Sequence, residues 1–218
     1  VRIVPHAVSL PPNIDPASWR ADAGRRFLVV THFNMASGFE RKNPLAAVAA
    51  FRQAFAEDSG ACLIIKMLNA HAWPEGERRL RAAIGGASNI KLVTRLMSRS
   101  EIFSLLAAAD AVISLHRAEG FGLLAAEAML LGKPVIATDW SATSEFLNAQ
   151  NSCPVSFRLV PAIDPQGNYH YPDQLWASPD AGDAARWLRR LRDDPDLRRR
   201  LGDRARSDAS QFSSEAYQ

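Results

Sequence analysis

Short apolar runs recur along the chain, and longer stretches bounded by helix-start and helix-end residues separate them. Runs of this kind, with β-branched residues such as Ile64 and Ile65, are typical of buried strands. A further short strand is expected within Pro154–Leu159, and Val1–Val8 is expected to be extended. The strongest strand candidates are Phe27–Thr31, Ala61–Met67, Ile90–Thr94, Ala111–Leu115 and Pro134–Thr138.

The stretches between the runs carry helix signals. Pro44 suits a first helical position with Asn43 as the cap, and Ser98 with Glu101 forms a capping box. Strands that alternate with helices predict an α/β, Rossmann-like, three-layer domain, with a parallel sheet and helices on both faces. The predicted helices are 44–59, 74–84, 98–109, 123–131, 180–193 and 195–212.

A glycine-containing loop joins the fourth predicted strand to its helix. In a parallel sheet this loop lies at the carboxyl edge of the strands, where open α/β folds bind ligands. The amides of Gly120, Phe121, Gly122 and Leu123 have no partner inside the helix and sit at its positive end. The two glycines let a ligand approach the backbone closely. The loop therefore favours an anion such as a phosphate.

Two carboxylates accompany this loop. Glu119 precedes the first glycine, and Glu127 lies eight positions further on, inside the helix. A sugar nucleotide would use every feature, with amides for the diphosphate and the acids for sugar and ribose hydroxyls. A capped helix whose N-terminal acid offsets the dipole is the simpler alternative.

Composition adds limits to this picture. The chain has 218 residues, 47% apolar and 22% charged, with a net charge of +3, which suits an anionic ligand without requiring nucleic acid. The Arg residues of the last two helices alternate with Asp, as on a solvated, salt-bridged face. Cys62 and Cys153 give neither a disulfide framework nor metal-ligand spacing, so a reducing cytoplasm is expected. We see no membrane-spanning run and no signal peptide.

The segment from Glu119 to Asp139 resembles the Glu-x7-Glu region of retaining glycosyltransferases with the two-domain GT-B fold, especially family four. It reads Glu-Gly-Phe-Gly-Leu and then Glu-Ala-Met-Leu-Leu-Gly-Lys-Pro-Val-Ile-Ala-Thr-Asp. The resemblance implies that residues 1–218 form one nucleotide-sugar-binding domain, half of a GT-B fold, with residues 1–26 as a linker or edge segment. It also implies a retaining transfer of a mannosyl- or glucosyl-type unit from a GDP- or UDP-sugar, as in polysaccharide biosynthesis.

The resemblance assigns roles residue by residue. Glu119 would orient the donor sugar as the catalytic residue, and Glu127 would bind the ribose. Lys42 matches the phosphate-binding lysine. Many relatives carry an arginine nearer the strand end, where this chain reads His32-Phe33-Asn34, so whether Arg41 supplies the second cation stays open. Gly120, Phe121, Gly122 and Leu123 would bind the diphosphate; no metal and no cofactor besides the donor is implied.

Other assignments keep their alternatives. The loop with Thr94 and Arg95 would contact the base, although Arg95 could simply be exposed. His116 could donate to a phosphate or be a structural histidine. We expect Lys66, at a strand end, to reach solvent and Asp110 to be a turn acceptor. Many relatives have Gly-Gly where this chain has Trp140-Ser141, so their sugar contacts cannot be transferred.

The acceptor-binding half is expected to lie outside this chain, which begins at Val1 without an initiator Met. The isolated chain should then transfer little sugar, with the nucleotide sugar and the missing domain as its partners. Peripheral membrane association of the full enzyme stays open. Two alternatives are a non-catalytic Rossmann-like nucleotide-binding module and half of a sugar-phosphate epimerase. For the first alternative, this chain lacks Gly-x-Gly-x-x-Gly after its first predicted strand, so a dinucleotide ligand is not expected.

Overall fold

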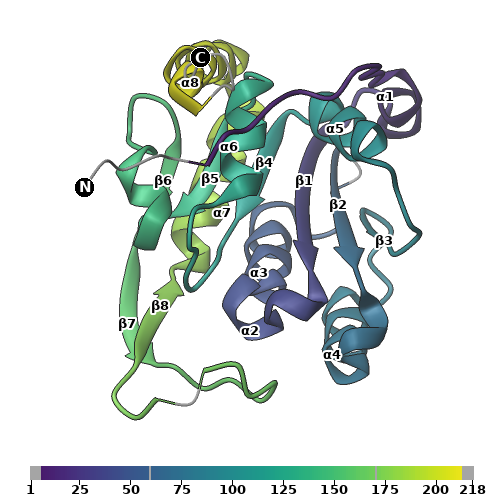
Figure 1. Ribbon diagram of the computed structural model, residues 1–218. Helices are drawn as coiled ribbons and strands as arrows, with labels where there is room; N and C mark the ends of the chain where they lie inside the picture. The colour runs from purple at the N-terminus through teal and green to yellow at the C-terminus, as the bar shows by residue number, and fades with distance from the viewer. Residues whose placement is uncertain (1–5, 59, 170, 213–218) are drawn as a thin grey trace.

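A parallel sheet of six strands, in the order β3-β2-β1-β4-β5-β6, forms the centre of the computed structural model (Figure 1). The model describes residues 6–58, 60–169 and 171–212; the rest, including Val1–Pro5 of the expected extended piece, lie outside the description. The strands are β1 (Phe27–Asn34), β2 (Ala61–Leu68), β3 (Ile90–Val93), β4 (Ala111–Ser114), β5 (Val135–Thr138) and β6 (Cys153–Val155). A two-stranded antiparallel hairpin, β7 (Phe157–Pro161) and β8 (Leu175–Pro179), stands apart from this sheet.

The strand order reverses direction between β1 and β4. The chain adds β2 and β3 on one side of β1, and then returns to place β4, β5 and β6 on the other side. All strands of the sheet run the same way, so their carboxyl ends share one edge. Ligands of such folds bind at this edge, next to the reversal point. The segments that follow β1 and β4 are therefore the first place to look for a site.

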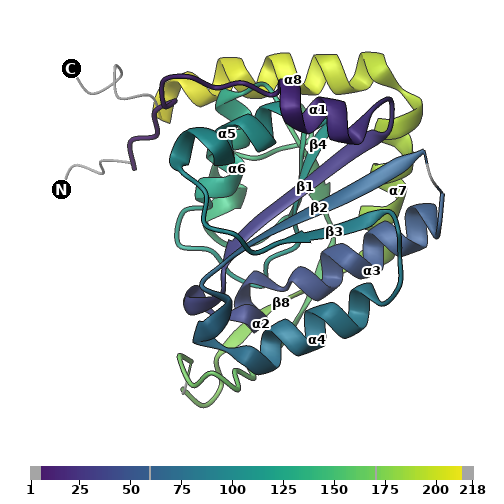
Figure 2. The same ribbon diagram turned by 90° about the vertical axis from the view of Figure 1, so that its right-hand side faces the viewer.

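Helices cover both faces of the sheet, and the predicted three-layer α/β fold is confirmed (Figure 2). Consecutive strand residues point to opposite faces, so Leu28 and Val30 pack on one side and Val29 on the other. The helix α8 contributes to both layers. The helices are α1 (Ala17–Ala23), α2 (Phe39–Lys42), α3 (Pro44–Phe55), α4 (Pro74–Ile84), α5 (Arg99–Ala108), α6 (Leu123–Leu130), α7 (Ala181–Asp193) and α8 (Pro195–Ala209).

Three segments differ from the sequence-based expectation. The helix α1 forms within residues 1–26, which were expected to be a linker or edge segment. The expected loop 32–42 instead contains the end of β1, the short helix η1 (Met35–Ser37) and α2. The expected strand 154–159 is divided between β6 and β7, and β8 was not expected at all.

The capping predictions have mixed outcomes. Ser98 and Glu101 form the expected capping box of α5. Pro44 begins α3 and Asn43 is its N-cap residue, as expected, but the side chain of Asn43 makes no capping hydrogen bond. Asn43 adopts a left-handed φ of 50°, and its Nδ2 donates to the carbonyl of Leu115 at 2.9 Å. Its side chain therefore ties the end of α2 to the end of β4.

The prediction that Lys66 reaches solvent is wrong, and Asp110 is an acceptor for the distant residues Arg20 and Leu28 rather than the turn acceptor that was expected. Lys66 is fully buried, and its Nζ donates to the carbonyls of Met67 at 3.0 Å and Arg95 at 2.8 Å. Burial, followed by the charge of Arg95, lowers the pKa of Lys66. Asp110 accepts the backbone N–H of Leu28 at 2.7 Å.

The two cysteines are buried free thiols, and they pack on opposite faces of the sheet, Cys153 in one core cluster and Cys62 in the other. They therefore do not pair with each other. Within the described ranges, no helix combines the length and the apolar character that crossing a membrane requires.

Candidate functional site

Glu119 meets two cations beside the point where the strand order reverses. Its carboxylate accepts a hydrogen bond from Lys42 Nζ at 2.5 Å and another from Arg41 Nη1 at 3.1 Å. The side chain of Glu119 is only 10% exposed, against 13% for Arg41 and 23% for Lys42. The backbone N–H of Arg117 also donates to the carbonyl of Arg41 at 2.8 Å. The segment after β1 and the loop after β4 are thus joined by charge and by backbone.

The two cations keep Glu119 ionised. Burial raises the pKa of Glu119, but the charge and hydrogen bond of Lys42, followed by the charge of Arg41, outweigh it and hold the pKa below its ordinary value. Two cations against one carboxylate leave a net positive charge, which is available to an anion.

The glycine turn lies directly after Glu119. Gly122 has a φ of +96° and precedes the first residue of α6, a conformation that suits glycine. In the described part of the chain, the amides of Gly120, Phe121, Gly122 and Leu123 have no recorded acceptor. They lie at the positive end of α6, where a phosphate would find donors.

Ser141 fixes the backbone of the catalytic candidate. Its Oγ accepts the N–H of Glu119 at 2.9 Å and donates to the carbonyl of Trp140 at 2.6 Å. Ser141 has a φ of 65°, which is uncommon for a residue other than glycine. The sequence shows Trp140-Ser141 here in place of the Gly-Gly of many relatives, but it does not predict the hydrogen bond between Ser141 and Glu119.

Glu127 has the opposite electrostatic setting from Glu119. It lies in the second turn of α6, half-buried, and burial raises its pKa to about 7, against a smaller opposing effect of Arg99. Two carboxyl groups whose pKa values move apart are suited to different tasks. Glu119 is ionised at neutral pH, whereas Glu127 exchanges its proton there.

This difference predicts how stability depends on pH. Between the ordinary pKa of 4.5 and about 7, folded Glu127 retains a proton that the unfolded chain has lost, so its contribution to stability falls as pH rises. Glu127→Gln should therefore be more stable than the parent at pH 8, by on the order of 2 kcal/mol. The gain should shrink toward zero near pH 4.5 in urea unfolding curves.

A comparison with Glu119→Gln provides the control. The pKa of Glu119 is lowered, so its stabilisation is present at neutral pH and is lost on acidification. Glu119→Gln should therefore be less stable than the parent at pH 8, with the gap closing at low pH. Two variants with the same sign of pH dependence would contradict these assignments.

Two histidines near the site are neutral. His116 is fully buried, and its ring contacts Ser114 Oγ at 3.2 Å and Thr143 Oγ1 at 3.1 Å. Burial is the main cause of its lowered pKa, and the charge of Glu119 opposes the shift. The ring thus joins β4 to the segment after β5, which fits a structural histidine. Its contact with a donor stays a prediction.

His32 also lacks a charge. Burial, then the charges of Lys66 and Lys42, lowers its pKa to about 4. Its Nε2 is buried, with no partner recorded in the described ranges. His32, in the segment where many relatives carry an arginine, therefore does not supply a second cation. Arg41, which shares Glu119 with Lys42, is positioned to do so.

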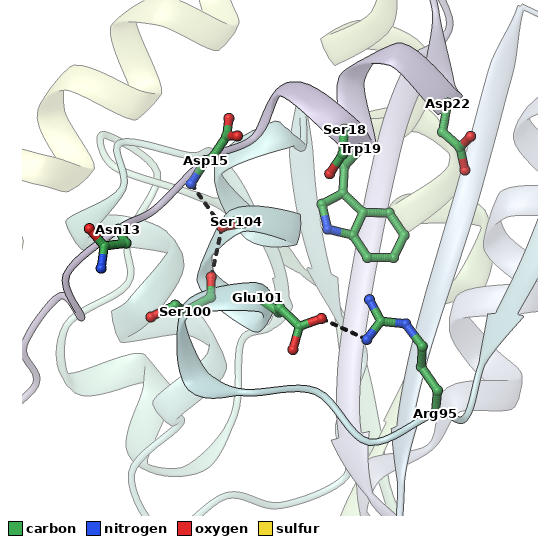
Figure 3. A pocket seen from close by; sticks show the side chains of 9 residues that line it. All are labelled: Asn13, Asp15, Ser18, Trp19, Asp22, Arg95, Ser100, Glu101 and Ser104. Atoms are coloured by element: carbon green, nitrogen blue, oxygen red, sulfur yellow. Dashed lines mark hydrogen bonds and ion pairs between the residues drawn. The ribbon is translucent and has the colours of Figure 1, made fainter.

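Thr94 and Arg95 lie further along the sheet edge, after β3. Both are exposed, and Arg95 turns its guanidinium toward Glu101, with Nη1 to Oε1 at 2.7 Å, and over the ring of Trp19 at 5.9 Å (Figure 3). The base contact stays a prediction for this loop, whose Arg95 carbonyl is held by Lys66. The cavity in Figure 3 measures about 490 Å³ and is lined by Asn13, Asp15, Ser18, Trp19, Asp22, Arg95, Ser100, Glu101 and Ser104.

The cavity near Trp19 and the charged cluster at Glu119 are separate places. None of the residues that line the cavity belongs to the glycine turn or to α2. We place the candidate site at the cluster, because two cations meet the carboxylate of Glu119 there, directly before the free amides of the glycine turn and next to the strand reversal. Among the residues that the structure describes, no group of three or more His, Cys, Asp or Glu side chains could hold a metal ion.

Comparisons with known proteins place this geometry in a context. A family model described as "Family 4 Glycosyltransferase in conflict systems" matches residues 2–215. The trehalose synthase of Pyrococcus horikoshii is 29% identical over 60% of this chain and 36% of its own length. The chain thus spans little more than a third of that curated relative.

Solved structures share the fold. HepE from Anabaena, in complex with UDP and glucose, matches with a TM-score of 0.69 and 20% identity over 95% of this chain and 50% of its own. Sucrose-phosphate synthase from Thermosynechococcus elongatus matches with a TM-score of 0.71 and 22% identity, over 99% of this chain and 49% of its own. The C-terminal domain of LpcC, a glycosyl transferase group 1 family protein from Francisella tularensis, matches with a TM-score of 0.66 and 18% identity. The match covers 94% of this chain and 96% of that domain.

Proposed function

Because this chain belongs to the family 4 glycosyltransferases of conflict systems, we propose that it is the donor-binding half of a retaining glycosyltransferase. The full enzyme would transfer a mannosyl- or glucosyl-type unit from a UDP- or GDP-sugar to an acceptor. The convergence of Lys42, Arg41 and the free amides of the glycine turn around Glu119 carries this proposal.

The arrangement suits the chemistry of the leaving group. When the glycosidic bond to the diphosphate breaks, negative charge develops on phosphate oxygens and positive charge on the sugar. Fixed amides and cations stabilise the first without reorganisation. Glu119 is ionised, so it can accept hydrogen bonds from sugar hydroxyls. Glu127, eight positions along, would bind the ribose diol.

Glu119 competes with the donor for the two cations, and this gives a test. Glu119→Gln removes the negative charge that Lys42 and Arg41 share, while Arg41 stays bonded to the carbonyls of Ser37 and Ala118, so UDP or GDP without a sugar should bind several-fold more tightly. The same substitution in the full-length enzyme should lower transfer by at least roughly tenfold, because sugar orientation is lost. Calorimetry and a transfer assay measure the two effects. A variant that binds the nucleotide normally and transfers sugar at the parent rate would leave Glu119 as a mere helix-end acid.

A nucleotide panel discriminates the alternatives. We expect UDP or GDP at millimolar concentration to raise the melting temperature of the chain, because a ligand that binds only the folded state stabilises it. NAD should have no effect. Stabilisation by NAD alone would favour a Rossmann-like module without transfer chemistry, and stabilisation by none of the nucleotides would contradict donor binding.

We also propose that residues 1–218 alone transfer little sugar. The chain spans half of HepE and almost all of the C-terminal domain of LpcC, which supports an acceptor half outside these residues. The isolated chain should therefore bind donor without forming product. Rapid transfer to an acceptor by this chain alone would contradict the proposal.

A further inference from the structure

The β7–β8 hairpin projects past the carboxyl edge of the sheet, and its connecting loop, described for residues 162–169 and 171–174, returns toward α2 (Figures 1 and 2). The hairpin is not hydrogen-bonded into the six-stranded sheet. Hydrogen bonds nevertheless attach it to the candidate site at its loop and at its second strand, and Phe157 of its first strand packs on the ring of Trp140 at 5.2 Å.

The first attachment is a single side chain. Gln166 Oε1 accepts the backbone N–H of Phe39 at 2.5 Å, and Gln166 Nε2 donates to the carbonyl of Met35 at 3.2 Å. Phe39 is the first residue of α2, and the residue before it, Gly38, has no side chain to cap the helix. Gln166 therefore supplies the missing cap from 127 positions away in the sequence.

A helix as short as α2 needs such support. Its four residues are far below the length at which a helix is stable in water by itself. Its end is held by Asn43, which donates to the carbonyl of Leu115, and its start is held by Gln166. The last two residues of α2 are Arg41 and Lys42, so the position of the cation pair depends on these two attachments.

The second attachment joins the hairpin to the loop after β4. The N–H of Ala177 donates to the carbonyl of Arg117 at 2.9 Å, and the N–H of Arg117 donates to the carbonyl of Arg41 at 2.8 Å. The guanidinium of Arg117 lies over the ring of Trp176 at 5.4 Å, and Tyr169 packs on that ring at 6.0 Å. The hairpin, the central loop and α2 are thus linked in series.

We propose that the described part of the connecting loop, residues 162–169 and 171–174, is a structural part of the donor site, and that Gln166 is the positioning residue that sets Arg41 and Lys42 opposite Glu119. The proposal rests on the proposed function for its consequence, donor affinity, but not for its structural content. Both hydrogen bonds of the Gln166 side chain are made with backbone atoms next to α2, so we infer that it acts through the cations rather than on the donor. A small displacement of charged groups is enough to weaken binding strongly.

The structural content is tested without a ligand. The N–H groups of Lys42 and Asn43 donate to the carbonyls of Gly38 and Phe39 inside α2. In Gln166→Ala, hydrogen exchange at these two amides should accelerate at least roughly tenfold, whereas amides of the buried strand β2 keep their protection. Asn168→Ala is the matched control, because Asn168 lies in the same loop and is exposed. Equal exchange in both variants would overturn the proposal.

The consequence is tested with the nucleotide that stabilises the parent chain. Gln166→Ala should weaken its binding by roughly three- to tenfold in calorimetry, and Asn168→Ala should not. In a Lys42→Met background Gln166→Ala should weaken binding less than in the parent, because the part of its effect that passes through Lys42 is already lost and only the part through Arg41 remains. Fully additive losses would overturn the positioning role.

One further variant and two outcomes complete the test. Gln166→Glu keeps the acceptor for Phe39 but places a carboxylate oxygen against the carbonyl of Met35, so it should also expose the amides of α2. If the parent binds no nucleotide while the exchange result holds, the proposed function fails and the positioning role stands. If the parent binds and exchange is unchanged, the positioning role alone fails.

Discussion

Lys42→Met is expected to weaken the binding of a nucleoside diphosphate by roughly ten- to a hundredfold, since charge-assisted hydrogen bonds contribute about 1.5–3 kcal/mol. Lys42 lies at the end of α2, beside the glycine turn, and its ammonium is the nearest cation to Glu119 at 2.5 Å. Arg41 remains in the variant and preserves part of the affinity. Calorimetry with UDP and GDP measures the loss.

Lys91→Met is the matched control for this experiment. It removes the same charge and the same aliphatic side chain, but Lys91 lies on β3 and pairs with Asp22 at 3.4 Å, away from the turn. Its affinity should equal that of the parent. Equal losses in both variants would mean that Lys42 contributes only through net charge, and the site assignment would then be wrong.

Gly122→Ala is expected to be the most damaging single-methyl change in the site. At a φ of +96° a side chain is strained, and a Cβ at this position would approach Thr143 Cγ2 to 2.4 Å. Together, backbone strain and the clash should cost about 2–4 kcal/mol of stability. The turn must shift to relieve the clash, so nucleotide binding should fall as well. Urea unfolding and calorimetry give the two values.

Two variants separate the causes of this effect. Thr143→Ser removes the obstructing methyl while keeping the hydroxyl that contacts His116, so it should restore part of the stability of Gly122→Ala. Gly120→Ala is the control, because a Cβ there meets no atom within 4 Å and its φ is not in the left-handed region. A stability loss in Gly120→Ala as large as in Gly122→Ala would contradict the account.

The sequence predicted the layers of this fold because local rules decide them. Apolar runs as short as Ala111–Leu115 favour buried strands over helices, and the Ser98–Glu101 box fixes where α5 begins. The glycine turn followed from its position between a strand and a helix. These features depend on neighbours in the sequence, so periodicity and capping are sufficient to find them.

The features that the sequence did not predict depend on distant partners. Lys66 can be buried because two carbonyls, one of them from the loop after β3, accept hydrogen bonds from its Nζ. The side chain of Asn43 makes no capping hydrogen bond and donates instead to a carbonyl 72 positions away. The cap that Gln166 gives to α2 crosses most of the chain. A side chain with a long-range partner has no periodic signal, so only the fold reveals it.

The most direct test of the donor site is a titration of the 15N-labelled chain with UDP and GDP, followed by amide shifts. We predict that the largest changes fall on Gly120, Phe121, Gly122 and Leu123, while the indole N–H of Trp19, in the cavity of Figure 3, does not move. Shifts centred on Trp19, or no shift with either nucleotide at millimolar concentration, would contradict a diphosphate site at the glycine turn.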